Sequence, residues 1–559
     1  MSVQPEAFIE QAEYLDRQSF IDWGADHPDE SAILRKLTQG GAKLISGPRG
    51  CGKTTLMLKA YNKLLKDQAV LPVYVNFKRS LVIEPLYAAG DKGTYVFNQW
   101  ILLKMYEGLY RTIGELGESI FLSIDAADAA ERIAALEMSR FELIPGLDLN
   151  INRLELDLLR VIDKCNRARC VLLLDDAAHA FSAEQQRDFF DFFRQIKSRE
   201  VSPKAAVYPG VTSYSSSFHV GHDAEEIDVW VKPDRPGYIE FMRRVVESRF
   251  PPSIYPALYA DREVLDFLCY STFGIPRAFL NILQAVVDSS DDGDETFRGF
   301  KRRAVLQEVK QHYQNTLKLF RSLKDKVPTY RNFIEHGEVV LTNAIDLVKE
   351  YNRSKSVGKQ SVSIAINASD MTPELVRLFS LFQYAGLCIS KGVVSRGEKG
   401  RFEIYVLHYS ALISANALLG KKAVNLGDYV TAFASRDAHE FTRVSPSTLT
   451  GGKNVATLFE LSLPPCSVCG APRNNRDARF CANCGSKLTL SSTYTQLISQ
   501  DIAALPLTEA RVAKIKEQSS IRQVKDILLD KEHRELRGVD RIGPYWAGRI
   551  VRLAEEFVE

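Results

Sequence analysis

The sequence lacks any long apolar run. No stretch of its 559 residues approaches the roughly 18 consecutive apolar side chains that a membrane-spanning helix needs. The first residues, MSVQPEAFIEQAEYLDRQ, contain acids and no apolar core of the kind that directs secretion. We therefore expect neither membrane insertion nor secretion, and we predict a cytoplasmic protein.

A marked excess of either charge is also absent. Lysine and arginine number 72, and aspartate and glutamate number 70, which gives a formal net charge of +2. A near-neutral total does not exclude nucleic acid as a partner, because a basic face can be hidden within it. Hydrophobic residues at 45% and charged residues at 25% are typical of folded proteins. The length predicts roughly three to five domains.

Cysteines suited to a disulfide framework are few. Five of the nine are scattered, which is typical of a reducing compartment. The other four form two CxxC pairs separated by eleven residues, each followed directly by glycine: Cys466, Cys469, Cys481 and Cys484. Two such turns aim four thiolates at one point, which predicts a structural Zn²⁺ site of the zinc-ribbon type with no coordination position open for catalysis. Disulfide pairing is the alternative.

Between about residues 20 and 290, apolar strand-like runs alternate with longer helical patterns. This order is expected of a parallel sheet with covering helices, so we predict a multidomain α/β fold. The runs expected to be central strands are AKLISG (42–47), LPVYVNF (71–77), CVLLLDD (170–176) and AAVYPGVT (205–212).

A phosphate-binding loop follows the first run. The residues GPRGCGKT match the pattern GxxxxGK[ST], after an apolar strand and before a helical stretch. Glycines let backbone N–H groups turn toward a phosphate, Lys53 supplies charge to the β- and γ-phosphates, and Thr54 offers a hydroxyl to Mg²⁺. The expected nucleotide-binding residues are Gly47, Pro48, Arg49, Gly50, Cys51, Gly52, Lys53, Thr54 and Thr55. Cys51 is expected to be a small filler, with a reactive thiol as the weaker alternative.

Two acids end the third run. The aliphatic residues before Asp175 and Asp176 predict a buried strand that delivers both carboxylates to the edge of the sheet where ligands bind. Asp175 is the expected Mg²⁺ partner, and Asp176 is the candidate that polarises the attacking water. For two acids taken alone, a solvated strand end is the alternative.

Further polar side chains could complete this site. Thr212 or Ser213, after the fourth run, could sense the γ-phosphate, although hydroxyls after a Pro-Gly pair could equally serve a turn. Arg277 lies in a helical stretch and could reach the γ-phosphate if that stretch closes over it. An ordinary surface charge is the alternative for Arg277.

In combination, GPRGCGKTTLM, LLLDD, the strand before Thr212 and GIPR in a helical lid resemble the AAA+ and STAND ATPases of the origin-recognition-complex type, over roughly residues 15–420. The resemblance implies ATP bound between core and lid, Arg277 at the sensor-2 position, Thr212 or Ser213 near sensor 1, and oligomers in which a neighbour completes the site. Asp176 stands where replication initiators usually have glutamate, whereas aspartate is common in STAND switches. The neighbour's arginine is undecided among Arg187, Arg194, Arg199 and Arg243.

The rest of the chain predicts further modules. A helical stretch at 373–387 is followed by CISKGVV and RFEIYVLHY, a hairpin pattern that indicates a winged helix. The predicted domains are the ATPase core (1–233), a helical lid with a connecting helix (234–326), the winged helix (327–420), a linker (421–462), the zinc ribbon (463–490) and tandem helix-hairpin-helix modules (491–559).

Segment 507–558 resembles helix-hairpin-helix modules, most closely at VDRIGPYWA (539–547). In that family a glycine-bounded hairpin points backbone N–H groups at a DNA phosphate. Gly543 fills the second glycine position, whereas Arg541 stands at the first and adds a charge that could itself meet phosphate. A protein-docking helical bundle is the alternative.

Basic residues in several modules favour DNA as a partner, although a charge run is usually a solvated face. The candidates for DNA contact at the hairpin tip and in the C-terminal modules are Lys391, Arg396, Lys399, Arg401, Arg541, Gly543 and Arg549. The connecting helix adds Arg298, Lys301, Arg302, Arg303 and Lys310, and the ribbon adds Arg473, Arg476, Arg479 and Lys487.

These features predict a switch that binds ATP and Mg²⁺, hydrolyses ATP to ADP and phosphate, forms homo-oligomers, and loads, remodels or recruits a partner on DNA. The alternative is a STAND-type signalling or defence ATPase whose zinc ribbon and helical module bind protein. No nuclease, protease or helicase motif set is recognisable.

Overall fold

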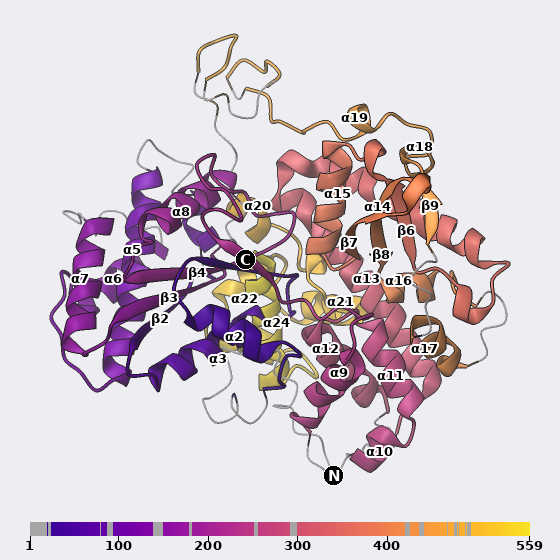
Figure 1. The fold of residues 1–559 in the computed structure, drawn as a ribbon, viewed down its shortest axis with the longest axis horizontal. Helices are drawn as coiled ribbons and strands as arrows, with labels where there is room; N and C mark the ends of the chain where they lie inside the picture. Colours follow the sequence, from indigo (N-terminus) through magenta and orange to yellow (C-terminus); the bar gives the residue numbers. More distant parts are fainter. Residues whose placement is uncertain are drawn as a thin grey trace.

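The chain forms two lobes with its C-terminal helices between them (Figure 1). The structure is a computed structural model, and it describes residue 20 and residues 24–78, 80–85, 93–137, 149–177, 182–250, 255–290, 299–419, 425–434, 441–466, 468–473, 478, 480–486, 488 and 493–558. Among these residues no helix is both long enough and apolar enough to cross a membrane.

A five-stranded parallel sheet forms the centre of the first lobe, which confirms the predicted α/β class. The strand order is β2 (Val70–Asn76), β3 (Arg169–Asp175), β4 (Val201–Val207), β1 (Lys43–Ser46) and β5 (Glu225–Asp228). Strand β3 therefore lies between β2 and β4, so that its carboxyl end is flanked by theirs.

The fourth strand differs from the predicted run. Strand β4 begins at Val201 and ends at Val207, whereas the prediction was 205–212. The first half of β4 was not predicted because two of its buried side chains are polar and interrupt the apolar run. Ser202 Oγ accepts from Gly41 N at 3.1 Å, and Lys204 Nζ donates to Gln39 O at 2.8 Å.

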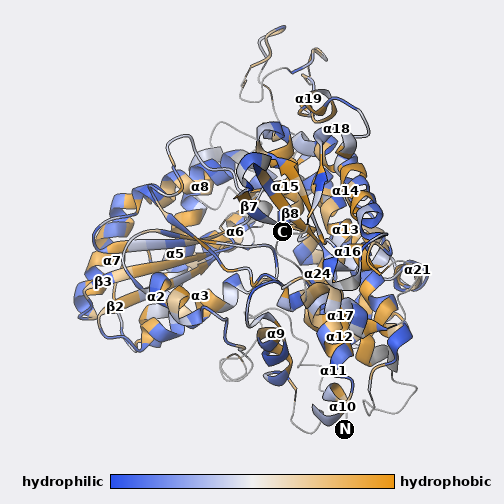
Figure 2. Cartoon of the chain, turned by 45° about the vertical axis from the view of Figure 1, so that its right-hand side comes forward, coloured by the Kyte–Doolittle hydropathy of each residue, from blue (hydrophilic) through white to orange (hydrophobic). Residues whose placement is uncertain are grey.

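Helices cover both faces of the sheet, because alternate side chains of each strand point in opposite directions. Helices α2 (Glu30–Thr38) and α3 (Lys53–Leu65) pack on one face, and α5 (Gly93–Glu115) packs on the other. Figure 2 shows the resulting stripes of hydrophobic and hydrophilic residues along the helices. The remaining core helices are α6 (Ala126–Glu137), α7 (Ile151–Lys164) and α8 (Ala183–Gln195).

The helical pattern predicted for residues 234–326 is confirmed. The lid helices are α9 (Tyr238–Glu247), α10 (Tyr255–Tyr259), α11 (Arg262–Ser271) and α12 (Pro276–Ser290). The 25-residue helix α13 (Arg302–Lys326) then leads into the second lobe.

The second lobe contains a mixed sheet with strand order β7 (Cys388–Ser395), β8 (Arg401–Leu407), β6 (Ser363–Asn367) and β9 (Thr442–Val444). Strands β7 and β8 form the predicted hairpin, and α15 (Pro373–Tyr384) precedes it. Strand β9 lies within the segment expected to be a linker and pairs in parallel with β6, so part of that segment is folded. The other helices packed here are α14 (Arg331–Asn352), α16 (Tyr409–Ser414) and α17 (Leu426–Ala434).

The C-terminal helices lie against both lobes instead of projecting from them (Figure 1). They are α20 (Thr493–Ile498), α21 (Glu509–Gln518), α22 (Val524–Leu529), α23 (Arg534–Arg537) and α24 (Pro544–Val558). The cysteine segment before them, which follows the short helices α18 (Pro446–Leu449) and α19 (Val455–Leu458), projects at the top of the view in Figure 1.

Candidate active site

The predicted phosphate-binding loop connects β1 to α3. Gly50 and Gly52 have φ angles of 83° and 102°, which side chains with a Cβ rarely adopt, and Gly52 caps the start of α3. Lys53 is 5% exposed, and its Nζ donates to Gly47 O at 2.7 Å and to Pro48 O at 3.1 Å. Burial lowers the pKa of this ammonium, while the charges of Cys51, Asp176 and Asp175 act in the opposite direction.

Both predicted acids lie at the carboxyl end of β3, beside Lys53. Asp175 is fully buried and accepts a hydrogen bond from Tyr74 on β2, with 2.9 Å between Oδ2 and the phenol oxygen. Its other oxygen accepts from Asp176 N at 3.0 Å. Asp176 is 9% exposed and has a φ of 51°, so the chain turns sharply at this residue. A solvated strand end is therefore not what the structure shows.

Tyr208 lies in the candidate site but was not predicted from the sequence. It follows β4 directly, and its hydroxyl donates to Asp176 Oδ1 at 2.7 Å. Its ring also lies under the lysine, with 3.6 Å between Lys53 Nζ and the ring centroid. Burial and the neighbouring Asp176 carboxylate raise the pKa of Tyr208 well above its usual value, so its hydroxyl stays a donor.

Of the two hydroxyls predicted to sense the γ-phosphate, that of Thr212 is used locally. Thr212 Oγ1 donates to Tyr208 O at 2.8 Å and accepts from Tyr208 N at 3.0 Å. Ser213 N donates to the side-chain oxygen of Gln186. The structure therefore favours the turn alternative for Thr212.

Arg277 lies where the lid meets the phosphate-binding loop. Its backbone N donates to Gly50 O at 3.4 Å, and a Cβ built on Gly50 would lie 2.8 Å from Arg277 Cβ. Its guanidinium lies 3.5 Å from the carboxylate of Glu556, on the last turn of α24. Arg49 of the loop donates to the backbone oxygen of the same residue at 2.9 Å. Loop, lid and C-terminal helix thus meet at one point.

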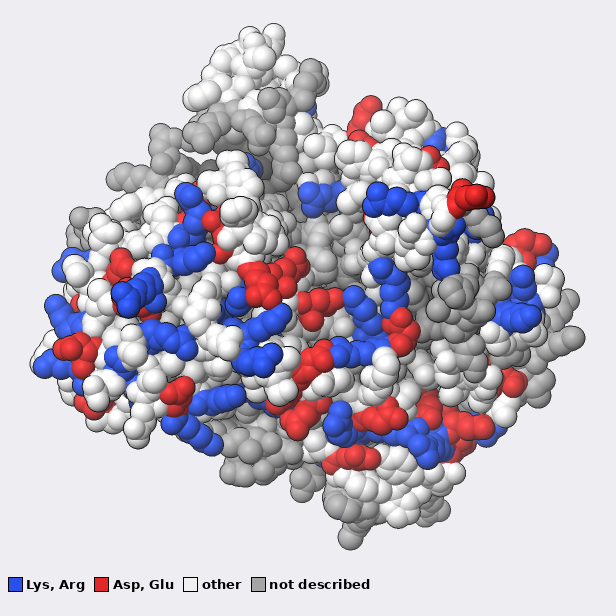
Figure 3. Space-filling model, in the orientation of Figure 1, with Lys and Arg blue, Asp and Glu red and all other residues white. Residues whose placement is uncertain are grey.

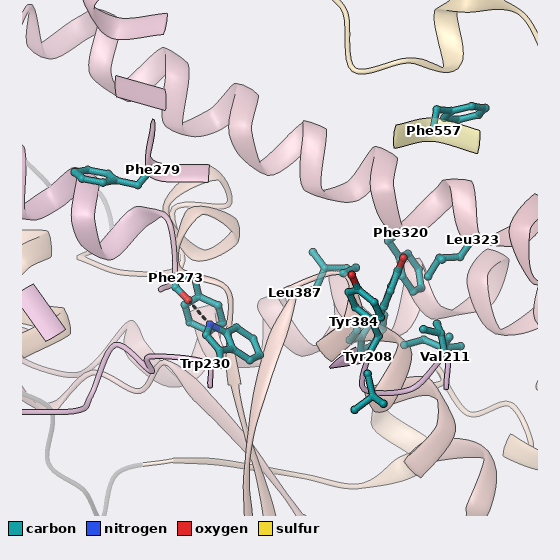
Figure 4. Close-up of a cluster of buried hydrophobic side chains, with 14 of the residues drawn as sticks. Tyr208, Val211, Trp230, Phe273, Phe279, Phe320, Leu323, Tyr384, Leu387 and Phe557 are labelled. Atoms are coloured by element: carbon teal, nitrogen blue, oxygen red, sulfur yellow. Dashed lines mark hydrogen bonds between the residues drawn. The ribbon is translucent and has the colours of Figure 1, made fainter. Parts of the chain in front are cut away.

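Helix α15 approaches the site from the second lobe. Arg377 Nη1 donates to Gly210 O at 2.9 Å, and the ring of Tyr384 meets the ring of Tyr208 edge to face with centroids 5.7 Å apart. Figure 4 shows Tyr208 and Tyr384 together in a buried cluster with Val211, Phe320 and Leu323. The site is therefore enclosed by segments that are far apart in the sequence.

Cys51 is a packing residue in this arrangement. It is 3% exposed, and its sulfur lies 2.6 Å from where a Cβ on Gly47 would be. Burial raises the pKa of the Cys51 thiol, which disfavours the thiolate that a reactive cysteine needs. The filler alternative is therefore favoured.

The four clustered cysteines converge as predicted. Their sulfurs all lie within 4.8 Å of one another, and two pairs, Cys466 with Cys484 and Cys469 with Cys481, are 3.6 Å apart. A tetrahedral zinc ion with bonds of about 2.3 Å would hold sulfurs about 3.8 Å apart, whereas a disulfide needs about 2.0 Å. The donor set therefore fits Zn²⁺ and disfavours disulfide pairing.

Several predicted DNA contacts are engaged inside the molecule. Lys391 forms an ion pair with Asp234 of the segment that leads into the lid. Arg549 donates to Asn281 Oδ1 at 2.9 Å and also to the side chain of Gln284, both on lid helix α12. In this structure the charges of these two residues hold parts of the chain together, and their contact with DNA stays a prediction.

The other DNA candidates differ in exposure. Arg401 and Arg541 are exposed, as is Gly543, whereas Arg396 lies over the ring of Phe441 with a centroid distance of 4.9 Å. Arg541 has a φ of 64°, which glycine usually supplies, so it adopts the conformation of the glycine it replaces. The side chains of Lys399, Arg298, Arg476, Arg479 and Lys487 lie outside the described residues.

One candidate for the neighbour's arginine is also engaged. Arg243 pairs through two nitrogens with Asp266, within the lid. Arg187 lies 3.3 Å from Glu184 on its own helix, while Arg194 and Arg199 are exposed. Arg194 and Arg199 are therefore the two of these four candidates with exposed side chains.

Comparison with known proteins gives distant structural similarities. No family model and no curated protein matches the sequence. Among solved structures, the chain is similar to the Orc1 protein of Aeropyrum pernix in complex with DNA, with 17% identity and a TM-score of 0.29, covering 71% of this chain and 93% of that one. It is also similar to Cdc6p from Pyrobaculum aerophilum, with 10% identity and a TM-score of 0.32, covering 75% of this chain and 98% of that one.

Proposed function

We propose that the protein is an ATP-binding and ATP-hydrolysing switch of the AAA+/STAND type that oligomerises and acts on DNA or is recruited to it. The observation that carries the ATPase part is the convergence of Lys53, Asp175, Asp176 and Arg277 at one edge of the parallel sheet. That edge is where open α/β sheets bind ligands.

Each of these residues has a distinct role in the proposed reaction. The backbone N–H groups of the loop and Lys53 would hold the β- and γ-phosphates. Thr54 and Asp175 would hold Mg²⁺, which neutralises phosphate charge when bound. Asp176 would accept a hydrogen bond from the attacking water and orient it toward the γ-phosphorus. Arg277 would stabilise the charge on the transferred group.

The roles of Lys53 and Asp176 can be separated by mutation. Lys53→Ala should abolish ATP binding, whereas Asp176→Ala should keep binding and slow turnover by about 100-fold or more. The matched control is Lys63→Ala, which removes an exposed lysine from the same helix. Binding is measured with a fluorescent ATP analogue and turnover by phosphate release. Equal loss of binding in both site variants would contradict this division of roles.

Support for DNA comes from the exposed basic residues and from the hairpin before α24. Arg401 on the β7–β8 hairpin and Arg541 before α24 are exposed and have no internal role among the contacts of the described residues. Figure 3 shows basic and acidic side chains interspersed over the face it presents, without a continuous basic stripe there. Any DNA contact on that face would therefore be local and would address phosphates, not base sequence.

A signalling or defence switch remains the second candidate, and one observation favours it. The last turn of α24 contacts both the phosphate-binding loop and the lid arginine. Nucleotide binding at that point would therefore act directly on the C-terminal module, which is what a switch that exposes an assembly surface requires. The Cys466–Cys484 metal site would then hold a protein-binding surface.

A further inference from the structure

Each acid of the proposed site is held by its own tyrosine. Tyr74 on β2 donates to Asp175, and Tyr208 after β4 donates to Asp176, at 2.9 and 2.7 Å. The strand order explains this pairing, because β2 and β4 flank β3 and end beside its two acids. Tyr74 is 4% and Tyr208 5% exposed, so neither phenol can be replaced by bulk water as a donor without rearrangement.

We propose that Tyr74 and Tyr208 are positioning residues with separate roles, an inference that rests on the proposed ATPase function. Tyr208 holds Oδ1 of Asp176 and so fixes the orientation of the carboxylate that is to orient the water. Tyr74 does the same for Oδ2 of Asp175, the proposed Mg²⁺ partner. Removing a phenol hydroxyl removes that restraint from the carboxylate.

The two phenylalanine variants distinguish these roles. Tyr208→Phe keeps the ring beneath Lys53 and removes only the hydroxyl. It should lower kcat about 10-fold with KM and ATP affinity nearly unchanged. Tyr74→Phe should instead raise the Mg²⁺ concentration needed for half-maximal turnover. Each variant serves as the control for the other, and thermal melting checks that both fold.

Two results would overturn this assignment. One is an unchanged kcat in Tyr208→Phe, and the other is the same response of both variants to Mg²⁺. If wild-type protein hydrolyses no ATP, or if Asp176→Ala hydrolyses it at the wild-type rate, the proposed function itself fails. The failure of the inference is therefore distinguishable from the failure of the ATPase.

A second inference comes from a different place, the last turn of α24. The Glu556 carboxylate lies 3.5 Å from the Arg277 guanidinium, with the two side chains 17% and 23% exposed. Arg49 of the phosphate-binding loop holds the backbone of Glu556. An acidic side chain of the C-terminal helix thus pairs with Arg277, the arginine that the proposed function assigns to the γ-phosphate.

The rest of α24 and the helices around it are fastened to the lid side. Tyr545 accepts from Gln284 Nε2 at 2.9 Å, and Arg549 donates to Asn281 of the same lid helix. Lys326 of α13 lies 5.7 Å from the ring centroid of Phe557. Because these contacts and the contact at Glu556 lie along one helix, loss of the Glu556 contact would weaken the packing of the whole of α24 against α12 and α13.

We infer that Glu556 is an internal competitor of the γ-phosphate and that ATP binding loosens the C-terminal module. This inference also rests on the proposed function, since it gives the site its regulation. Arg277 can pair fully with one anion at a time. By linkage, any ATP that takes Arg277 from Glu556 weakens the docking of α24, and the docking weakens ATP binding by the same factor.

Neutralising Glu556 in the full-length chain tests the competition. Glu556→Gln should bind ATP about 5-fold or more tightly than wild type, with a smaller gain for ADP, which lacks the γ-phosphate. Glu555→Gln removes the same charge from the neighbouring position and should bind both nucleotides as wild type does. Hydrogen exchange of residues 544–558 should rise when ATP is added to wild-type protein, and it should rise less with ADP.

Three results of these measurements would refute the competition between Glu556 and the γ-phosphate for Arg277. Equal gains for ATP and ADP in Glu556→Gln, no gain at all, or unchanged exchange in α24 would each overturn it. Wild-type protein that binds no ATP would instead remove the proposed function, with Lys53→Ala as the reference for absent binding.

Discussion

At the scale of single residues, two histidines lie together where α13, the lid and the second sheet meet, with His408 fully buried and His312 half-buried. The ring centroids of His312 and His408 are 5.4 Å apart, and the ring of Phe273 lies 4.8 Å from that of His408. Nε2 of each histidine has no hydrogen-bond partner among the described residues. Burial lowers the pKa of His312 to about 4 and that of His408 well below its usual value, so both rings are neutral in the folded protein.

This pair should make the protein acid-sensitive. The unfolded pKa of histidine is about 6.5 and the folded pKa of His312 is about 4, so the unfolded state binds more protons between these values. The free energy of unfolding should therefore fall as the pH falls from 6.5 to 4, by about 3 kcal/mol for His312. Urea denaturation at several pH values should show a smaller fall in the free energy of unfolding for His312→Gln than for wild type. His222→Gln, which changes an exposed histidine, should show the same fall as wild type. Parallel pH curves in wild type and His312→Gln would contradict this expectation.

Single residues also show what the sequence could and could not predict about the site. Lys53 and the glycines beside it were predictable because the loop motif is local. Tyr208 was not, because its contact with Asp176 depends on the order of the strands. Glu556 lies 507 positions from Arg49, and no pattern connects them. Thr212 was predicted as a γ-phosphate sensor because it carries a hydroxyl, but that hydroxyl forms hydrogen bonds within the turn after β4.

At the scale of elements, the contact between the loop after β4 and helix α15 should be sensitive to any added atom. Gly210 has a φ of 79°, and a Cβ there would lie 2.3 Å from the backbone of Ser380. Gly221 has a similar φ of 90° but nothing within 4 Å. Gly210→Ala should therefore destabilise the protein by about 1–3 kcal/mol for the backbone angle plus a further cost for the clash. Gly221→Ala should show the first cost alone, so the difference between their melting temperatures measures the clash. Equal melting temperatures would show that α15 can move away at little cost.

The cysteine module is an element whose loss should stay local. Its hydrogen bonds among the described residues are short-range, such as Gly470 N to Cys466 O at 2.8 Å and Gly485 N to Cys481 O at 2.9 Å. Cys481→Ser should reduce bound zinc from about one ion per chain to none, with ATP binding unchanged. Metal analysis and limited proteolysis measure the two effects, and Cys165→Ser is the control for a cysteine outside the cluster. Loss of ATP binding together with zinc would show that the module supports the core.

Elements were predictable where hydropathy and spacing suffice, as for the central strands, the lid helices and the β7–β8 hairpin. Strand β4 was shifted because Ser202 and Lys204 satisfy backbone groups inside the core. Strand β5 was missed because three of its four residues are exposed and acidic, and one buried residue gives no periodicity. Strand β9 lies in a weakly patterned segment and depends on pairing with β6.

At the scale of the whole molecule, the proposed nucleotide site is where distant parts of the chain come together. Helix α12 brings Arg277 and α24 brings Glu556 to the loop near residue 50, and α15 brings Tyr384 to Tyr208. The sequence indicated the modules but not this closure, because docking between folded modules depends on surface complementarity and leaves no periodic signal. A change of nucleotide at this point would reach the lid, the second lobe and the C-terminal helices directly.

The same closure bears on where DNA could bind, because some of the basic residues proposed for DNA contact also hold the modules together. Under the proposed DNA role, exposed Arg541, which has a φ of 64° in the turn before α24, is the phosphate contact that we assign to the C-terminal module. Arg541→Ala should weaken DNA binding about equally for all sequences and lower the slope of log affinity against log salt by about one. Arg353→Ala removes an exposed arginine after α14 and should leave both unchanged. Fluorescence anisotropy with linear, forked and single-stranded DNA, with ATP and zinc present, gives both quantities. If wild-type protein binds none of these DNAs at low salt, the DNA role is wrong, and a module released from Glu556 would have a protein as its partner.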